Sequence, residues 1–303
     1  MKHILTFIIL SLVLVAPACV KKGQVNNQQT PSSIDKGTTQ DIAQKDDMHI
    51  QANHPADPTC DGVNFYGQCA KLKGTITFGR YPQESDTPEP IEWRVLDMND
   101  NGQILIISEK VLDAKPYNMT SHYIDWEDIT IDNTIITWEN STIRSWLNGY
   151  DVFYNNDGIN FRSDNFIDAA FTAEEQAIIV TSNVPDHPNP NHTTTLCNAT
   201  TDRIFLLSIA EAQNYFSSDR LRRANATRYA VKKGASVYGS KSKEYTDDGT
   251  CTDVHYHADW WLRSPGDCTY YAAYVYSDGS VDYYGDFVDF GSYGVRPALW
   301  VKL

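Results

Sequence analysis

Residues 264–293 contain no Lys, no Arg and no Glu, although Lys and Glu are among the commonest residues of soluble proteins. The same 30 residues hold seven Tyr, two Phe and five Asp. Tyr with Ser and Gly is typical of binding loops, because a tyrosine ring offers a large amphipathic contact area at low entropic cost. Neighbouring side chains on a strand face opposite ways, so the pairs Tyr270–Tyr271 and Tyr283–Tyr284 exclude a purely internal role. The segment is therefore predicted to bind a ligand.

The chain also lacks a basic excess. It has 25 Lys and Arg against 39 Asp and Glu, which gives a formal net charge of −14. A protein that binds nucleic acid carries a basic patch, so nucleic acid is not an expected partner, and direct adhesion to anionic lipid is disfavoured. No internal repeat, phosphate loop, nucleophile elbow or Ser/His/Asp motif is evident in the sequence. We therefore expect a binding protein and not an enzyme.

Aromatic residues are absent from residues 20–59, which are rich in Gln, Asn, Thr, Ser, Lys and Asp. Such a segment cannot bury enough apolar surface to fold. Before it, residues 4–15 form an apolar run too short to span a bilayer, which predicts a signal peptide over residues 1–18. Cys19 follows a small-residue junction that resembles the bacterial lipobox, in which the Cys is acylated. The alternative is ordinary cleavage after Ala-x-Ala.

The resulting expectation is a disordered tether, residues 19–59, on a lipidated Cys19. The lipid would be the protein's only contact with the membrane. It would place the protein in the bacterial cell envelope, exposed at the surface. A flexible tether suits this role, because it holds a folded domain away from the lipid.

Residues 60–303 are numerous enough for one globular domain with a sizeable core. Strand patterns lie at both ends and helix-capping patterns lie in the middle. This arrangement predicts an α+β fold whose N- and C-terminal strands share one antiparallel sheet. Pro297 cannot donate a ladder hydrogen bond, so the last strand is expected at an edge or with a bulge. The expected strands are 75–78, 91–97, 103–108, 204–207, 260–262 and 295–301, and the expected helices are 139–147, the segment opened by 172–175, the segment opened by 208–211, and 227–233.

Cysteines of an exported chain can form disulfides. Cys60 and Cys69 bracket a short Gly-containing loop and are predicted to pair. Cys197 and Cys251, both flanked by loop residues, are the preferred second pair. Cys268 is then odd, and spacing alone leaves the connectivity open.

A series of motifs, in order along residues 72–303, resembles an uncharacterised bacterial domain family found on exported and surface proteins. That family is similar to the C-type-lectin-like fold in its formylglycine-generating-enzyme-like version. The resemblance implies that the terminal strands close together and that a long irregular C-terminal region displays the ligand site. The motifs are ITFGRYPQ (76–83), PIEWRVLD (90–97), LDAKPYN (112–118), TWENSTIRSWLN (137–148), FTAEEQAII (171–179), DRIFLLSIAEAQNYF (202–216), WWLRSPG (260–266) and GVRPALWV (294–301).

Some members of this family resemble targets of diversity-generating retroelements, which convert AAY codons to NNY in a C-terminal variable region. The positions that we assign as variable lack Lys, Glu, Gln, Met and Trp, which NNY cannot encode. An ordinary Tyr/Asp/Ser-rich set of loops is the alternative. The expected ligand is a protein or a glycan. The variable positions are 267–271, 276–277, 280, 282–284, 286–287 and 289–293, and the ligand-binding candidates are Asp267, Tyr270, Tyr271, Tyr276, Asp282, Tyr283, Tyr284, Asp286, Phe287, Asp289, Phe290 and Tyr293.

A second hypothesis concerns Asp253, His255, His257 and Asp259, which alternate and would share one face of a strand. His and carboxylate side chains at such spacing suit zinc, and they support the alternative of an exported metal-dependent or enzymatic domain. The other interpretation is a polar strand face. We expect no cofactor.

Calcium and the formylglycine-generating activity find less support in the residues. The calcium-lectin signatures are missing, although Asp278, Asp282 and Asp286 are candidates for a hard cation. The formylglycine-generating enzymes that the family resembles need two cysteines near the C-terminus, and here Cys268 is alone in that region. That activity is therefore not carried over to this chain.

Other polar residues are expected to play structural or solvent-exposed roles. Arg263 and Arg296 lie within the motifs WLRSP and GVRPA and are predicted to pair with buried carboxylates or carbonyls. His187 and His192 lie in a Pro/Asn-rich loop and are expected in solvent.

Overall fold

Alternating buried and exposed residues build the long strands Thr75–Pro82 and Pro88–Met98, whereas the strands Trp260–Pro265 and Ala298–Lys302 are mostly buried runs. The computed structural model describes residues 59–65, 67–121, 134–194, 197–238 and 256–302. These residues belong to one unit, Asp46–Leu303. The predicted signal peptide and almost all of the predicted tether lie outside the described residues, as do Cys19, Cys251, Asp253 and His255.

The first large sheet is antiparallel and joins the two ends of the domain. Its order is β15-β5-β4-β3, with β3 (Thr75–Pro82), β4 (Pro88–Met98), β5 (Gln103–Ser108) and β15 (Ala298–Lys302). The C-terminal strand therefore pairs with the N-terminal meander, as predicted. Pro297 directly precedes β15, which is an edge strand of this sheet, so its missing N–H leaves no gap in the ladder.

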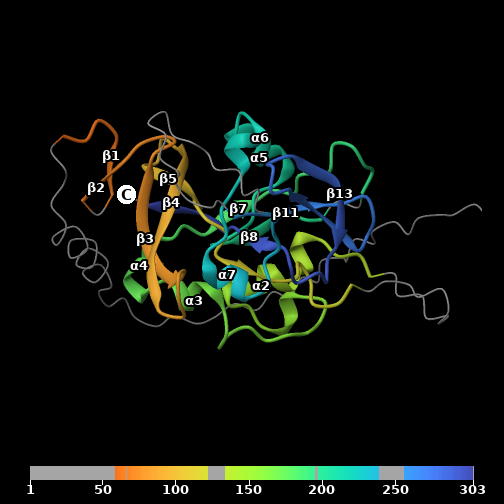
Figure 1. Ribbon diagram of the computed structural model, residues 1–303. Coiled ribbons are helices and arrows are strands. Elements are labelled where there is room, and N and C mark those ends of the chain that lie inside the picture. The colour runs from red at the N-terminus through yellow and green to blue at the C-terminus, as the bar shows by residue number, and fades with distance from the viewer. Residues whose placement is uncertain (1–58, 66, 122–133, 195–196, 239–255, 303) are drawn as a thin grey trace, which may run out of the picture. The chain divides into compact units, whose positions relative to one another are not determined.

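The second large sheet is mixed and has β11 at its centre. Its order is β13-β12-β11-β14-β6, and the pair β11–β14 is parallel while the others are antiparallel. Figure 1 shows β3 and β4 in orange at one end of the described unit and β13 in blue at the other. The strands are β6 (Asp113–Ala114), β11 (Trp260–Pro265), β12 (Tyr271–Val275), β13 (Val281–Phe287) and β14 (Gly294–Val295).

Three short antiparallel hairpins complete the strands. The hairpin β1–β2 carries the predicted disulfide between Cys60 and Cys69, while Cys197 and Cys268 are free thiols among the described residues. The prediction that Cys197 pairs with Cys251 stays a prediction, because Cys251 is not described. The hairpins are β1 (Val63–Phe65) with β2 (Gln68–Ala70), β7 (Ser182–Val184) with β8 (Thr200–Asp202), and β9 (Val237–Tyr238) with β10 (His257–Ala258).

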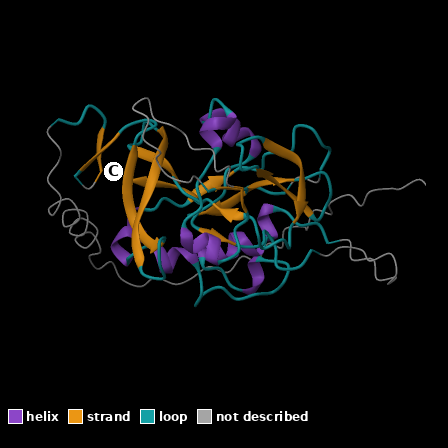
Figure 2. Ribbon diagram, in the orientation of Figure 1, coloured by secondary structure: helices purple, strands orange, loops and turns teal. Residues whose placement is uncertain are grey.

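The helices are short, most of them begin at a side chain that caps the first turn, and they flank the strands on two sides in Figure 2. The capping boxes predicted at Thr172 and Ser208 open α4 and α5. Gly149 ends α2 with φ of 69°, a conformation that favours glycine. No helix within the described residues is both long and apolar enough to cross a membrane. The helices are η2 (Trp138–Asn140), α2 (Thr142–Asn148), η3 (Val152–Tyr154), α3 (Phe166–Ala170), α4 (Ala173–Ile178), α5 (Ile209–Tyr215), α6 (Asp219–Arg222) and α7 (Arg228–Lys232).

The strand predicted over 204–207 is wrong in extent. Phe205 makes a single isolated bridge, with two hydrogen bonds to Ala298. The Ile204 N–H instead donates to Asn148 Oδ1 at 3.0 Å, and the Ile204 carbonyl accepts from Asn148 Nδ2 at 2.8 Å. Ser208 then caps α5, so the segment turns into a helix before a ladder can form.

Polar groups inside the core converge on Asp202, which is fully buried. Its carboxylate accepts hydrogen bonds from Trp138 Nε1 at 3.0 Å, Arg144 Nε at 2.8 Å and the Tyr150 hydroxyl at 3.1 Å. Breaking such a buried pair leaves a charge without compensation, which is strongly destabilising. Asp202 therefore joins η2, α2 and β8 into one structure.

Trp261 tests the packing of β11. It is fully buried, its ring centroid lies 4.1 Å from that of Tyr293, and its Nε1 donates to the Lys115 carbonyl at 3.0 Å. Trp261→Ala is expected to lower the free energy of unfolding by about 3–5 kcal/mol, measured by urea denaturation. Phe153→Ala, at an 89% exposed aromatic position, is the control and should change it by less than about 0.5 kcal/mol. A small loss for Trp261→Ala would contradict this account of the core.

Candidate ligand-binding surface

A bulge between β12 and β13 shapes the tyrosine-rich segment. Between the pairs Ala272–Asp286 and Tyr274–Asp282, β12 has one residue and β13 has three. Gly285 lies in this bulge with φ of 78°, and a Cβ there would come 2.5 Å from the Ala272 carbonyl oxygen. The extra residues bend β13 and leave Tyr283 outside the regular ladder.

One face of this sheet carries a stack of aromatic rings that runs from the interior to the surface. The ring of Tyr293 lies 4.1 Å from Trp261 and 4.6 Å from Tyr274, and Tyr274 lies 4.8 Å from Tyr276. Tyr274 and Tyr293 are buried, whereas Tyr276 is 39% exposed. The prediction that Tyr293 is exposed for binding is wrong, because its ring packs against Trp261. Tyr276 is the member of this stack that a ligand can reach.

Two carboxylates hold the hydroxyls of the stack. The Tyr293 hydroxyl donates to Asp286 Oδ2 at 2.6 Å, and the Tyr274 hydroxyl donates to Asp282 Oδ2 at 3.2 Å. Burial, followed by the hydrogen bond to Asp286, raises the pKa of Tyr293 well above its ordinary value. The hydroxyl therefore remains a donor at neutral pH, and the predicted ligand residues Asp282 and Asp286 also support the stack.

A second aromatic group lies on the opposite face of the same two strands. Tyr271 pairs with Phe287, one residue along from the Ala272–Asp286 pair, and neighbouring pairs face opposite ways. Tyr270 stacks on Phe287 at 5.7 Å, and Phe287 lies 5.4 Å from the 44% exposed Phe290. The rings of Tyr271 and Phe287 therefore face away from that of Tyr293, because neighbouring residues of a strand point to opposite faces of the sheet.

The third group forms where the bulge turns Tyr283 and Tyr284 aside. Gln213 Nε2 of α5 donates to the Tyr283 hydroxyl, and Asn189 Nδ2 donates to the Tyr283 carbonyl at 2.6 Å. Tyr284 is 65% exposed, and its ring centroid lies 4.7 Å from that of His192. The sequence reasoning missed His192 as a neighbour of this surface. Its place in a Pro/Asn loop carried no signal for a contact made through tertiary structure.

A small hollow of about 310 Å³ opens beside the second aromatic group. Asp267, Cys268 and Tyr270 line one side, and Ile135 and Thr193 line the other. Burial raises the pKa of the Cys268 thiol, which disfavours the reactive thiolate. Asp267, expected as a ligand residue, is half-buried at this hollow and donates its backbone N–H to the Tyr284 carbonyl at 2.8 Å.

We call the accessible residues of these three groups the aromatic surface. It is defined as Tyr270, Tyr271, Tyr276, Tyr283, Tyr284, Phe287, Asp289 and Phe290. Asp289 is exposed on the loop after β13, and its carboxylate makes no hydrogen bond or ion pair within the described residues.

Of the four proposed metal ligands, only His257 and Asp259 lie among the described residues. Asp259 is buried and accepts the backbone N–H of Ser277 at 2.6 Å. No group of three or more His, Cys, Asp or Glu is placed to hold a metal within the described ranges. Asp253 and His255 are not described, so the zinc hypothesis stays a prediction.

The candidate calcium ligands are engaged by the protein itself. Asp278 accepts from Ser280, Asp282 accepts from the backbone of Gly285 and from Tyr274, and Asp286 accepts from Tyr293. These carboxylates therefore hold the loops and rings of the protein in place, and no observation supports a calcium site there.

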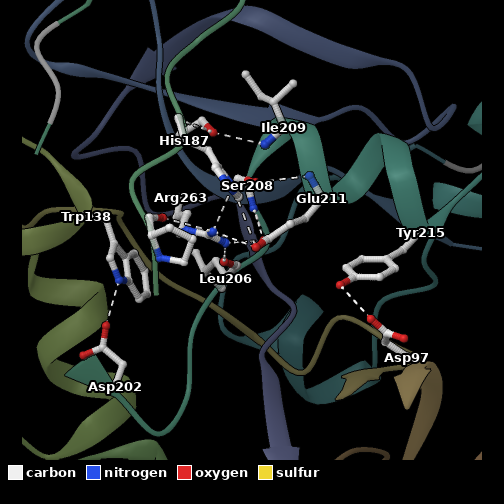
Figure 3. Close-up of polar contacts among 12 residues, drawn as sticks. Asp97, Trp138, His187, Asp202, Leu206, Ser208, Ile209, Glu211, Tyr215 and Arg263 are labelled. Carbon is white, nitrogen blue, oxygen red and sulfur yellow. Dashed lines mark hydrogen bonds and ion pairs between the residues drawn. The ribbon is translucent and has the colours of Figure 1, made fainter. Parts of the chain in front are cut away.

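Beneath the aromatic surface, β11 is anchored by Arg263, as predicted for this arginine. Its guanidinium is buried and makes a bidentate ion pair with Glu211, with Nη2 2.7 Å from Oε1 (Figure 3). Nη1 also donates to the Leu206 carbonyl at 2.8 Å. Burial alone would raise the pKa of Glu211, but the hydrogen bonds and charge of Arg263 outweigh it and hold that pKa below its ordinary value.

The second predicted structural arginine behaves similarly. Arg296 is buried, and its Nε donates to the Ser108 carbonyl at 2.8 Å. Burial lowers its pKa to about 10, which still leaves it charged at neutral pH. The residue therefore ties the segment before β15 to the end of β5 through carbonyl oxygens.

His187, Ser208 and Glu211 lie together beside Arg263 but are arranged for support (Figure 3). Ser208 Oγ lies 2.7 Å from His187 Nδ1, and Glu211 Oε1 lies 3.8 Å from the same nitrogen. A nucleophile and an orienting acid use opposite nitrogens of the ring, and Ser208 is fully buried as the cap of α5. His187 is half-buried here, so the expectation that it lies in solvent is wrong.

Comparisons with known proteins place the chain in a family. The family described as Domain of unknown function (DUF6273) matches residues 101–303, and the chain belongs to it. No curated protein and no solved structure matches the chain. The matched region contains every described helix, the whole second sheet and the aromatic surface, whereas β3 and β4 precede it.

Asp259 makes the stability of this region depend on pH. Burial raises its pKa to about 6, so the folded chain holds the proton that the unfolded chain releases at lower pH, and stability falls as pH rises between the two values. Asp259→Asn keeps the acceptor for Ser277 and cannot ionise. Urea unfolding should show it about 2–3 kcal/mol more stable than the parent at about pH 8, and within about 1 kcal/mol at about pH 4.5.

Asp289→Asn is the matched control, because it removes the same charge at an exposed position. It should differ from the parent by a similar small amount at both pH values. A gain for Asp259→Asn that is independent of pH would show that the buried carboxyl is not the cause.

Proposed function

We propose that this protein is a surface-anchored lipoprotein that binds a protein or glycan ligand through the aromatic surface. One observation carries the proposal. Three large aromatic side chains are exposed, Tyr276, Tyr284 and Phe290, and each contacts a ring behind it. Exposed aromatic side chains that are held against a second ring are typical anchors of binding interfaces.

The way in which these rings are held also supports binding. A side chain that is already confined before binding loses less entropy when the ligand arrives. Tyr276 rests on Tyr274, whose own hydroxyl is bonded to Asp282. Phe290 rests on Phe287, and both backbones belong to the region closed by β13 and β14. Such anchored aromatic residues typically dominate the affinity of an interface.

The proposed architecture is the C-type-lectin-like fold, displayed on a lipidated tether. The pairing of β15 with β5 brings the N- and C-terminal strands together, and the segment between β11 and β15 displays the aromatic surface. Both features are what the resemblance implies. A diversified C-terminal region is part of the proposal, because the buried Ala272 and Ala273 and the tightly packed Gly285 form a scaffold of small residues between the displayed rings.

Diversification has a direct test in the coding DNA. A near-repeat of the codons for residues 260–300, with AAY where the gene has NNY, should lie beside a reverse-transcriptase gene. A genome without such a repeat would remove diversification from the proposal and leave ligand binding untouched.

Photocrosslinking tests the binding surface. A photoreactive phenylalanine analogue at Tyr284, which is 65% exposed, should give a discrete adduct on intact cells. The same analogue at Leu72, 57% exposed and between β2 and β3, is the control and should give none. Excess parent protein should compete for the adduct, whereas a variant with Tyr276, Tyr284 and Phe290 changed to Ser should compete at least about tenfold less well. Equal adducts at both positions would contradict the proposal.

The lipid anchor is tested separately at Cys19. Radiolabelled palmitate should label the parent protein and should not label Cys19→Ala, because the acyl acceptor is the thiol of that residue. Cys268→Ala is the control and should keep the label. Equal labelling of the parent and Cys19→Ala would show that this Cys is not the acylated residue.

A further inference from the structure

A second recessed site lies between α2, η3 and β8, and no residue of the aromatic surface contributes to it. It is a hollow of about 650 Å³. Tyr150, Phe153 and Tyr154 supply aromatic lining, and Asn156, Arg144 and Thr201 supply polar lining. These residues come from segments far apart in the chain, so tertiary structure alone assembles the site.

Phe153 is the feature that most needs an explanation. It is 89% exposed, although phenylalanine is one of the residue types most often buried. The turn that carries it is fixed: Asp151 Oδ1 caps it by accepting the Phe153 N–H at 3.2 Å, and Ser145 Oγ donates to the Tyr154 carbonyl at 3.2 Å. Arg162 forms an ion pair with Asp151 at 2.7 Å. The fold therefore holds an aromatic ring out into solvent at the edge of the hollow.

The wall behind Phe153 is an ordered stack. The rings of Tyr150 and Tyr154 lie 4.6 Å apart, and the Arg144 guanidinium lies 5.1 and 5.9 Å from their centroids. Arg144 is buried, with Nε bonded to Asp202 and Nη1 bonded to the Glu139 carbonyl. Its Nη2 makes no hydrogen bond within the described residues. This nitrogen lies on a residue that lines the hollow and has a donor to offer.

Neutral polar groups complete the lining. The Asn156 amide and the Thr201 hydroxyl are exposed and make no hydrogen bond among the described residues. The charge of Arg144 is balanced by Asp202, and the carboxylate of Glu139 already accepts from the backbone and side chain of Asn198. The walls thus offer rings, an amide, a hydroxyl, one guanidinium paired with Asp202 and one carboxylate that accepts hydrogen bonds from Asn198.

We propose that this hollow binds a carbohydrate chain. A sugar ring has an apolar C–H face, which suits the negative face of an aromatic ring such as Phe153 or Tyr154. Its hydroxyls both donate and accept, which matches Asn156, Thr201 and Arg144 Nη2. The formal charge of −14 opposes nucleic acid and anionic lipid as occupants. The inference is independent of the ligand bound by the aromatic surface.

Native gel electrophoresis in the presence of soluble polysaccharides tests the proposal. The probes are hydroxyethylcellulose, glycol chitin, yeast mannan and soluble starch, followed by calorimetric titration with the hexasaccharide of whichever retards the protein. The parent protein should be retarded by at least one of them. Phe153→Ala should weaken binding at least tenfold, Phe153→Trp should restore it to within about threefold, and Asn156→Ala should weaken it severalfold. Each variant is checked by its urea unfolding curve, since an exposed position should leave stability unchanged.

Tyr238→Ala, at a 62% exposed position of β9 outside the hollow and the aromatic surface, is the matched control and should bind the polysaccharide as well as the parent does. Failure of this inference is thereby separated from failure of the proposed function, because each has its own variants. Retardation by none of the four polysaccharides would overturn the proposal, and so would retardation that Phe153→Ala leaves unchanged. Association with phosphatidylglycerol vesicles that Phe153→Ala abolishes would overturn it as well, by assigning the ring to a lipid surface.

Discussion

The buried ion pair between Arg263 and Glu211 is the constraint on which the second sheet depends. Arg263 belongs to β11, the central strand of that sheet, and Glu211 belongs to α5. Removing two charges from water is costly unless hydrogen bonds satisfy them. Here the Leu206 carbonyl also accepts a hydrogen bond from the Arg263 guanidinium. Removing either side chain would leave the other charge without its partner, which is destabilising. The position of β11 relative to α5 is therefore determined by this ion pair as well as by packing.

From β11 the packing constraint extends outward to the aromatic surface. Trp260 and Trp261 are neighbours on β11, so they bury their rings on opposite faces of the sheet. On the face of Trp261, the rings of Tyr293 and Tyr274 fill the interior and carry Tyr276 to the surface. The same pleat sends Tyr271 and Phe287 to the other face. The tyrosines therefore divide into those that support the surface and those that form it.

The aromatic surface and the hollow beside Phe153 are supported by different polar centres. The aromatic surface depends on the Arg263–Glu211 pair, whereas the hollow beside Phe153 depends on Asp202, which holds Arg144 and Tyr150 in place. Each centre is a carboxylate that accepts several hydrogen bonds, with Asp202 fully buried and Glu211 partly buried, and such networks rigidify the elements that contribute to them.

Much of this protein could be predicted from local patterns. The meander of β3 to β5, the caps at Thr172 and Ser208, the edge position of the last strand and the disulfide between Cys60 and Cys69 all follow from short-range chemistry. The composition of residues 264–293 also indicated the region of the exposed rings. These predictions succeeded because each depends on a few neighbouring residues and on the period of the strand or helix.

What the sequence by itself determined is thus the meander of β3 to β5, the caps that open α4 and α5, and the segment that holds the exposed Tyr276, Tyr284 and Phe290. The tertiary structure alone decided which tyrosines are exposed, because a bulge at Gly285 and the ring of Trp261 separate Tyr284 from Tyr293. It alone assembled the hollow beside Phe153 from η3, α2 and β8. The physical reason is that burial and convergence depend on long-range packing, and residues with the same local pattern differ only in what the rest of the chain places against them.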